Sequence, residues 1–396
     1  MHFLESLGAA STLLIFVATS PVDLQLRAGN SIVHQTTPKP FRKSGPAAIL
    51  ATYSKYNASA PKDVIKAVTA NDGKVLANPT QFDTEYLSPV IIGGQPLNLA
   101  IDTGSSDLWV FSSNLATSQS DGHSVYNPAL SSTSKRLDGY TWEIVYGDGS
   151  RARGDVGTDT VKVGTTTVTG QAVELADEIS YEFQNDIESD GILGLGFDAI
   201  NTVQPVPQKT FFSTAKAFLS APLFTANLRK GKPGCYTFGY VDATEYTGSI
   251  TYVPANSDNG FWEFTSNGYS VGTAAFRSSS FNAVADTGTT LVYLPDAIVR
   301  AYYRSVRGSG YNYAQGGYTY PCSANLPSFT VGIGTYRAVI PGSYITYATF
   351  DSITCFGGIQ SNNGLGIAVL GDIFLKSQFV VFQASPLQLG FARKPL

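Results

Sequence analysis

The stretch Ala100-Ile101-Asp102-Thr103-Gly104-Ser105 recurs 184 residues later as Val284-Ala285-Asp286-Thr287-Gly288-Thr289. Each copy leads into an apolar run, LWVF after the first and LVYL after the second. Each Asp is followed, at a similar distance along the chain, by two apolar residues and a Gly, which is Gly194 after Asp102 and Gly371 after Asp286. A single Asp-Thr-Gly is a common turn, but two copies in matching contexts indicate a duplicated lobe.

The chain around these copies has the pattern of a mostly-β protein. It contains 39 Gly, 22 Tyr and 23 Phe but a single Met, and Val, Ile and Thr recur in short alternating runs. Such runs, separated by turn residues, predict strands. We expect helices only near residues 211–219 and 297–306. The clearest strand runs are Tyr86–Gly94, Leu97–Gly104, Tyr140–Ser150, Thr158–Ala176 and Gly248–Pro254.

Composition excludes several classes of function. With 43% hydrophobic residues the chain can form a core, so it is neither disordered nor collagen-like. A formal net charge of -4 argues against nucleic-acid binding, which requires an excess of positive charge. Only His123 of the three histidines lies beyond residue 70, which argues against a multi-histidine metal site. We expect no metal and no cofactor, and we interpret His123 as a loop or packing residue.

The N-terminus has the pattern of a secretory signal. Residues 7–19 form the apolar run LGAASTLLIFVAT, which is too short to span a bilayer. His2 and Glu5 stand where a Lys or Arg is usual, and a buried N-terminal strand or helix is the alternative. We predict a signal peptide over residues 1–20 and a secreted, extracellular protein. The C-terminus carries no hydrophobic tail, so we expect no membrane anchor.

Charge divides the remaining chain. Residues 21–70 hold seven basic and two acidic residues, whereas the chain from Asn71 on holds 19 basic and 27 acidic residues. A basic segment can dock on an acidic domain, which suits a removable inhibitory pro-segment. A solvated basic linker is the alternative reading. We therefore expect a pro-segment over residues 21–70, an N-terminal lobe over 71–245 and a C-terminal lobe over 246–396.

Two carboxyl groups that meet across a duplicated fold have a defined chemistry. Within hydrogen-bonding reach they cannot both ionise, so they share a proton and titrate as a unit. The ionised member can take a proton from water while the protonated member donates to a substrate carbonyl. Asp102 and Asp286 are the candidates for this dyad. Around them, Gly104 and Gly288 let backbone amides approach, Thr103 and Thr287 can bond across the junction, and Ser105 and Thr289 can donate to the carboxylates.

These residues resemble the pepsin-like aspartic endopeptidases, and among them the secreted fungal group of penicillopepsin and aspergillopepsin. The resemblance covers about residues 82–396. It implies a bilobal fold, with two β-barrel-like lobes, an interdomain sheet and a cleft between them. Gly196 and Leu370 depart from the residues frequent in the family. The motifs that carry it are FDTEYLSPVIIGG, AIDTGSSDLWVFSS, GHSVYNP, YTWEIVYGDGS, DGILGLGF, NTVQP, ADTGTTLVYLP, GGIQSNNG and GDIFLKSQFVVF.

The resemblance also implies roles for residues outside the dyad. Tyr146 would lie in a flap that closes over the substrate, with its hydroxyl supported by Trp109. Gly147, Asp148 and Gly149 would form the flap tip. Phe183 and Ile192 would line the pocket for the residue before the cleaved bond, and Gly288 and Thr289 would bind substrate backbone. In the pro-segment, Lys55 and Tyr56 resemble the pair that holds the dyad in zymogens.

The resemblance pairs Cys322 with Cys355 in a disulfide. Such a bond would close a 34-residue loop and contribute on the order of 3 kcal/mol in the chain-entropy account. Cys235 is then unpaired. We interpret it as a small buried apolar residue, with an exposed reactive thiol as the alternative.

Three functions compete. The resemblance implies an acid endopeptidase acting on polypeptides, made as a zymogen and monomeric. A catalytically inactive pepsin-fold protein that binds peptides is the alternative, but such members usually lack one Asp or the flap tyrosine, and this chain has all three. A two-carboxylate glycosidase is disfavoured, because nothing places its acid and nucleophile on such a repeated pair.

Asp148 refines the expected specificity. An apolar pocket of Tyr146, Phe183 and Ile192 should favour Phe, Leu or Tyr before the cleaved bond. A carboxylate at the flap tip would also reach the end of a Lys whose stem lies along those walls. Fungal members with Asp at this position accept Lys, so the resemblance agrees. A solvated turn aspartate is the alternative reading.

Overall fold

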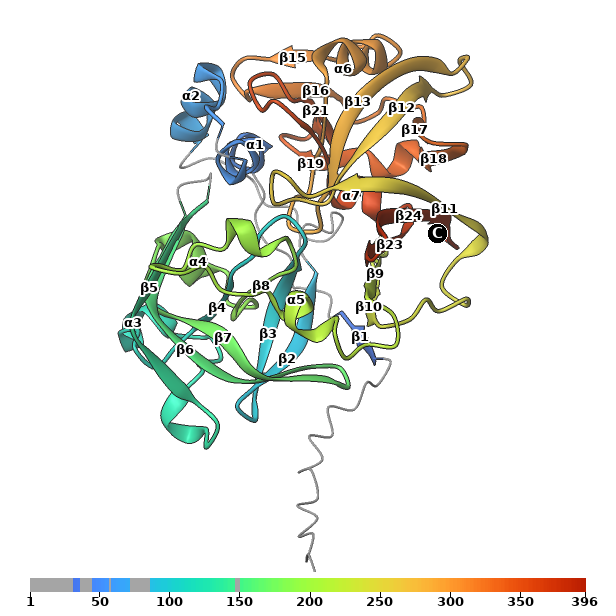
Figure 1. Ribbon diagram of the computed structural model, residues 1–396. Coiled ribbons are helices and arrows are strands. Elements are labelled where there is room, and N and C mark those ends of the chain that lie inside the picture. Colours follow the sequence, from blue (N-terminus) through green and yellow to red (C-terminus); the bar gives the residue numbers. More distant parts are fainter. Residues whose placement is uncertain (1–30, 36–44, 57, 72–85, 147–149) are drawn as a thin grey trace, which may run out of the picture.

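The structure is a computed structural model that describes residues 31–35, 45–56, 58–71, 86–146 and 150–396. Two β-rich lobes lie one above the other and are joined through a shared sheet (Figure 1). The mostly-β, bilobal fold expected from the sequence is confirmed. No helix among the described residues is long and apolar enough to cross a membrane.

The first lobe is a closed barrel of six strands with a seventh added at one edge. Its strands follow the order β2-β3-β8-β4-β7-β6-β5, and pairing of β2 with β6 closes the ring. Alternate residues of β2 and β3, such as Val90, Ile92, Leu97 and Leu99, fill the barrel because successive side chains point to opposite faces. The strands are β2 Leu87–Ile92, β3 Gln95–Asp102, β4 Leu108–Phe111, β5 Lys135–Val145, β6 Arg151–Val163, β7 Thr166–Ile179 and β8 Gly191–Gly194.

The second lobe repeats the central part of the first. β13 ends just before Asp286 and runs parallel to β22, as β3 runs parallel to β8 in the first lobe. The duplication read from the sequence is therefore a duplication of strand pairing. Its strands are β12 Glu263–Val271, β13 Arg277–Ala285, β14 Val292–Leu294, β17 Phe329–Ile333, β18 Tyr336–Ile340, β21 Ile359–Ser361 and β22 Ala368–Leu370. A small separate sheet holds β15 Gly310–Asn312, β16 Gly317–Pro321, β19 Thr346–Thr349 and β20 Thr354–Gly357.

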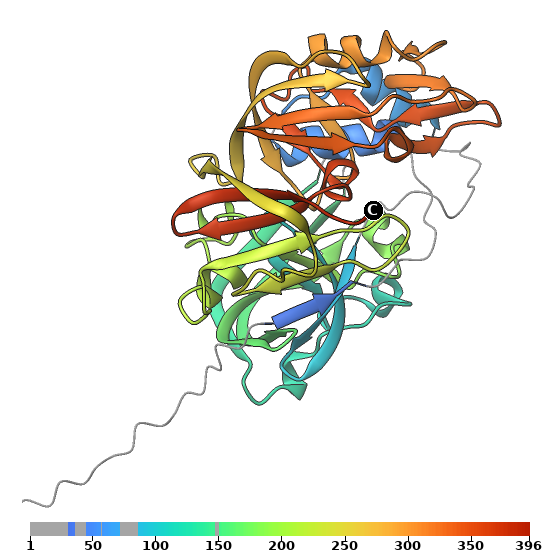
Figure 2. The same cartoon turned by 90° about the vertical axis from the view of Figure 1, so that its right-hand side faces the viewer.

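An interdomain sheet connects the lobes in the order β1-β10-β9-β23-β24-β11. Its first strand comes from the predicted pro-segment, and Figure 2 shows this strand beside the sheet. The strands are β1 Ser31–His34, β9 Leu223–Asn227, β10 Cys235–Phe238, β11 Thr247–Asn256, β23 Phe379–Ala384 and β24 Leu387–Arg393. A large aromatic core, including Phe224, Trp262 and Phe382, packs against it.

The described helices are short, and only α5 and α6 of the seven described α-helices were expected. The expected helix near 211–219 ends at Ala215, and the one near 297–306 covers residues 296–303. Two helices of the predicted pro-segment, α1 and α2, lie against the second lobe (Figure 1). The helices are α1 Gly45–Lys55, α2 Lys62–Asn71, α3 Thr117–Ser120, α4 Tyr181–Asn185, α5 Phe211–Ala215, α6 Asp296–Tyr303 and α7 Asp372–Leu375, with 3-10 turns at 128–130, 198–200 and 342–344.

The cysteines follow the predicted pattern. Cys322 and Cys355 form a disulfide with an S–S distance of 2.05 Å, which ties the end of β16 to β20. Cys235 is unpaired and buried within β10, as expected for a small apolar residue. Burial raises the pKa of its thiol to about 12, so the reactive thiolate is disfavoured.

Candidate active site

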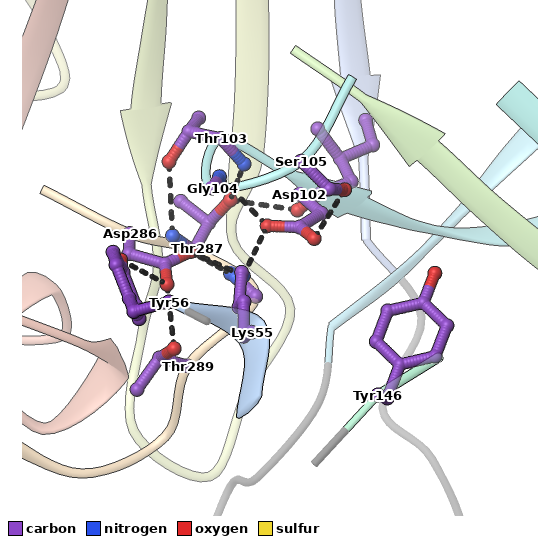
Figure 3. A network of polar contacts seen from close by, with 12 residues as sticks. Lys55, Tyr56, Asp102, Thr103, Gly104, Ser105, Tyr146, Asp286, Thr287 and Thr289 are labelled. Carbon is purple, nitrogen blue, oxygen red and sulfur yellow. Dashed lines mark hydrogen bonds and ion pairs between the residues drawn. The ribbon is translucent and has the colours of Figure 1, made fainter. Parts of the chain in front are cut away.

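Two loops of near-identical sequence meet at the junction of the lobes. Thr103 N–H donates to Thr287 Oγ1 at 3.0 Å, and Thr287 N–H donates to Thr103 Oγ1 at 3.0 Å. Each hydroxyl in turn donates across the junction, to the Ala285 and Ile101 carbonyls at 2.9 and 2.7 Å. This reciprocal set fixes the two loops relative to each other and buries both threonines (Figure 3).

The loops hold the two carboxyl groups in equivalent settings. Gly104 N–H donates to Asp102 Oδ1 at 2.8 Å, and Gly288 N–H donates to Asp286 Oδ1 at 2.9 Å. The outer oxygens accept from Ser105 and Thr289, each at 2.5 Å. All six supporting residues expected from the sequence thus contact either a carboxyl group or the opposite loop.

The glycines are required by close approach of the opposite carboxyl group. A Cβ on Gly104 would lie 2.5 Å from Asp286 Oδ1, and one on Gly288 would lie 2.1 Å from Asp102 Oδ1. Real Cβ atoms do not come that close to a neighbour, so any side chain here would displace a carboxyl group. These contacts also show that each aspartate faces the other loop across the junction.

The predicted pro-segment reaches this point through the end of α1. Lys55 Nζ lies 2.7 Å from Asp102 Oδ1 and 2.9 Å from Asp286 Oδ1, and Tyr56 OH donates to Asp286 Oδ2 at 2.9 Å. The Lys55 side chain is 8% exposed and the two carboxyl groups are almost fully buried. Figure 3 shows the ammonium group between the two aspartates.

Burial and the lysine act on these groups in opposite directions. Burial dominates for Asp102 and raises the pKa of its carboxyl group, despite the nearby ammonium. Burial also pushes the pKa of Asp286 upward, but Lys55 and the Thr289 and Gly288 donors outweigh it and lower that pKa. Burial disfavours a charged Lys55, yet both carboxylates outweigh it and raise the pKa of the ammonium group. The Lys55 ammonium and the two carboxyl groups therefore stabilise one another's charges in a site that is almost inaccessible to water.

An aromatic cluster borders the dyad on the side of the first lobe. Trp109 Nε1 donates to the Tyr146 hydroxyl at 2.9 Å, and Phe183 packs edge-on against both rings. Ile192 packs against the same cluster from β8. Burial raises the pKa of the Tyr146 hydroxyl well above its usual value, so it stays protonated. The structure thus brings together Tyr146, Trp109, Phe183 and Ile192; Gly147, Asp148 and Gly149 lie outside the described residues.

Sequence reasoning missed the contacts that fasten α1 and α2 to the second lobe. Tyr53 OH donates to the Asn363 carbonyl at 2.5 Å, and Tyr293 OH donates to the Ala48 carbonyl at 3.1 Å. Tyr311 OH donates to Asp63 Oδ2 at 2.5 Å beside a cavity of about 310 Å³ between the helices and the lobe. The Ala-rich composition of residues 45–55 was the available signal for a helix.

His123 lies away from the dyad. Its ring stacks on Phe111 with 3.8 Å between centroids, and its nitrogens face the Ser189 and Gln184 carbonyls. It is a packing histidine, as interpreted from the sequence. Within the ranges that the structure describes, no group of three or more His, Cys, Asp or Glu side chains is arranged to hold a metal ion.

Comparison with known proteins agrees with this geometry. A family model for eukaryotic aspartyl proteases matches residues 85–394. Aspergillopepsin-1 of Aspergillus fumigatus is 51% identical over 380 residues, which cover 95% of each chain. Penicillopepsin-3 of Penicillium janthinellum is 53% identical over 340 residues, covering 85% of each chain. Aspergillopepsin-1 of Aspergillus oryzae is 48% identical over 386 residues, covering 98% of each chain.

Proposed function

The chain belongs to the eukaryotic aspartyl protease family and is an aspartic endopeptidase, and from this premise we propose that it is secreted as a zymogen and cleaves polypeptides in acid through Asp102 and Asp286. The observation that carries the proposal is the pair of carboxyl groups on matched loops, both in contact with one pro-segment lysine.

The proposed mechanism follows from the loop geometry. With Lys55 withdrawn, two buried carboxyl groups remain close together without a counter-charge, and they then share a proton, as in the well-known case of this enzyme class. The ionised member takes a proton from a water molecule, which attacks the peptide carbonyl carbon. The protonated member donates to the carbonyl oxygen, which gives a tetrahedral adduct without a covalent bond to the enzyme. The adduct then collapses: the acid that took the proton from water gives it to the amide nitrogen, the C–N bond breaks, and the amine and the carboxylic acid leave. The Gly104, Ser105, Gly288 and Thr289 donors stabilise the charged dyad.

Lys55 and Tyr56 support the zymogen part of the proposal. Lys55 occupies the space between the carboxyl groups, so neither is free to activate water, and Tyr56 occupies the second oxygen of Asp286. Strand β1 and helices α1 and α2 anchor the pro-segment at separate places on the molecule. Its net positive charge complements the acidic remainder of the chain.

For specificity, we propose a preference for large apolar residues, and also for Lys, before the cleaved bond. Phe183 and Tyr146 provide apolar ring surface beside the dyad. The Lys preference rests on Asp148 of the flap tip and on the resemblance of this segment to fungal members of the family.

The test of the proposal is cleavage of casein or haemoglobin in acid by the activated protein, with and without a statine peptide that mimics the transition state. We expect cleavage that the statine peptide abolishes. Tight binding of the statine peptide without cleavage would instead support the peptide-binding alternative.

A further inference from the structure

A second pair of carboxyl groups lies buried behind the loop that carries Asp102. Asp107 follows this loop directly, and Glu174 lies on β7 beside Trp109 of β4. Both residues are 1% exposed. Neither takes part in the mechanism proposed above, and no basic side chain is recorded as a bonding partner of either among the described residues.

One amide joins the two carboxyl groups. Asn201 Nδ2 donates to Glu174 Oε1 at 2.9 Å and lies 3.2 Å from Asp107 Oδ1. The amide cannot be turned around, because its oxygen already accepts from the Gln208 N–H at 2.6 Å and the Val203 N–H at 3.3 Å. Asn201 therefore presents its donors to both acids.

The two acids differ in the number of donors that they receive. Asp107 Oδ1 also accepts from the N–H and the hydroxyl of Thr202, both at 2.8 Å, as an ionised carboxylate would. Glu174 Oε2 is buried and has no hydrogen-bond partner among the described residues. A buried carboxylate oxygen without a donor is strongly disfavoured, whereas a protonated Glu174 would donate to its neighbour Asp107. Burial and Asp107 raise the pKa of Glu174 well above its usual value, in line with this assignment.

The pair supports two parts of the active site at once. Asp107 directly follows the loop that carries Asp102, and Asn201 also donates to the Ser106 carbonyl of that loop at 3.1 Å. Gln204, three residues after Asn201, exchanges backbone hydrogen bonds with Thr141 of β5 at 2.8 and 3.1 Å. β5 leads to Tyr146, so one cluster connects the dyad loop to the base of the flap.

We propose that Asp107 and Glu174 share one proton and that Glu174 is a positioning residue, which holds the dyad loop and the base of the flap only while it is protonated. The titratable groups that face the pair are Asp102 on the dyad loop and Tyr146 at the flap. β4 contributes the Trp109 side chain and the backbone N–H of Leu108, which favours a charged Glu174 but is outweighed by burial and Asp107, and the 201–202 segment contributes neutral donors. Because none of these groups supplies a positive charge, loss of the proton leaves two adjacent carboxylates.

The sign of the pH dependence follows from linkage. Glu174 binds its proton more tightly in the folded chain than in the unfolded chain. Its contribution to stability is therefore complete below the usual value of 4.5 and is lost as pH rises through the folded-state pKa. This cluster should favour an enzyme that works in acid and should weaken the fold toward neutrality.

Glu174→Gln is the decisive variant, because its amide can donate to Asp107 without a titrating proton while its oxygen still accepts from Asn201. The test is the melting temperature of the full chain as a function of pH from 5 to 8, a range in which the proposed pro-segment should stay bound. The variant should lose less stability across this range than the wild type. Glu178→Gln, which removes an accessible carboxylate from the same strand, should keep the wild-type slope.

A second measurement follows kcat/KM of the activated enzyme against pH. Glu174→Gln should stay within about 2-fold of wild type near pH 3.5 and should extend activity toward neutral pH, whereas Glu174→Ala should lose roughly 10-fold or more at every pH. The activity measurement rests on the proposed function, and the melting measurement does not. A Glu174→Gln chain with the wild-type melting slope, or one that fails to fold, would overturn the inference even if the chain is a protease.

Discussion

Asp102 and Asp286 have pKa shifts of opposite direction although their loops are close copies of each other. Their backbone and hydroxyl donors match one for one, so the lobes themselves do not account for the difference. Burial pushes both pKa values upward, and the difference comes from the pair itself: the negative charge of Asp286 raises the pKa of Asp102, whereas Lys55 and the Thr289 and Gly288 donors lower the pKa of Asp286. One acid of a close pair therefore keeps its charge while the other holds a proton more tightly.

At this scale we expect Asp102→Asn and Asp286→Asn each to abolish turnover. An amide neither accepts a proton from water nor shares one with the other carboxyl group. The check is the rate of casein cleavage in acid, alongside the melting temperature of each precursor. Asp258→Asn, a change at an exposed position, is the matched control. More than trace activity in either variant would contradict the assignment of Asp102 and Asp286 as the catalytic residues.

Gly104→Ala provides a steric test of the same site. The new Cβ would lie 2.5 Å from Asp286 Oδ1, so the carboxyl group or the loop must move. We expect a large loss of kcat and a destabilisation of about 1–3 kcal/mol, as is typical of overpacking. Gly310→Ala adds the same methyl group in open space and should change neither quantity. A fully active Gly104→Ala enzyme would show that the loops are looser than this geometry requires.

At the scale of elements, helix α1 positions Lys55 at the dyad. Its buried Ile49 and Tyr53 pack against the second lobe, and its last residue reaches the dyad. Asp286 has a lowered pKa, so its contribution to docking is fully present above the usual value of 3.8 and is lost as pH falls through its lower pKa in the precursor. Asp102 has a raised pKa, so its protonation in acid does not weaken docking in the same way. We therefore expect release in acid to depend on Asp286, which loses the negative charge that pairs with Lys55.

The proposed flap is the element in which the substrate preference can be tested. We expect the enzyme to cleave after Lys as well as after Phe, because the proposed role of Asp148 is to pair with the end of the Lys side chain. Asp148→Thr should remove cleavage after Lys and spare cleavage after Phe in matched peptides. Because the pairing needs an ionised carboxylate, the Lys preference should fade first at the most acidic pH. Equal loss for both peptides would mean that Asp148 shapes the flap and does not recognise the substrate.

At the scale of the whole molecule, the proposed pro-segment is anchored at three places: β1 pairs with β10 in the interdomain sheet, Lys55 bridges the aspartates of the two lobes, and α2 bonds to the second lobe. We expect the secreted precursor to trim itself at about pH 3 to 4, giving an N-terminus near residues 66–72, because acid protonates the carboxylates that retain the pro-segment. Mass analysis of the product identifies the new terminus.

Purified Asp102→Asn precursor is the control for self-processing. It should stay intact in acid on its own and should be trimmed when active enzyme is added. If it trims as fast as the wild type, another protease performs the processing.

The sequence by itself determined the duplicated β-lobes, the two Asp-Thr-Gly loops and the disulfide partners suggested by the resemblance. The lobes and loops depend on local signals, which are the alternation of apolar residues for the strands and a repeated tripeptide for the loops, whereas the pairing of Cys322 with Cys355 came from the resemblance alone. The predicted helix at residues 211–219 was too long, because α5 ends at Ala215 and no local signal sets that end.

Only the tertiary structure decided how distant segments meet. The reciprocal Thr103 and Thr287 bonds, the 2.5 Å limit at Gly104 and the pairing of β1 with β10 join residues far apart in the chain. The same holds for Glu174, which looks like an ordinary strand residue in the sequence and becomes exceptional because it is buried beside Asp107 and Asn201 with no positively charged partner among the described residues. Burial and charge proximity are properties of the folded chain, and they set the protonation of both carboxyl pairs.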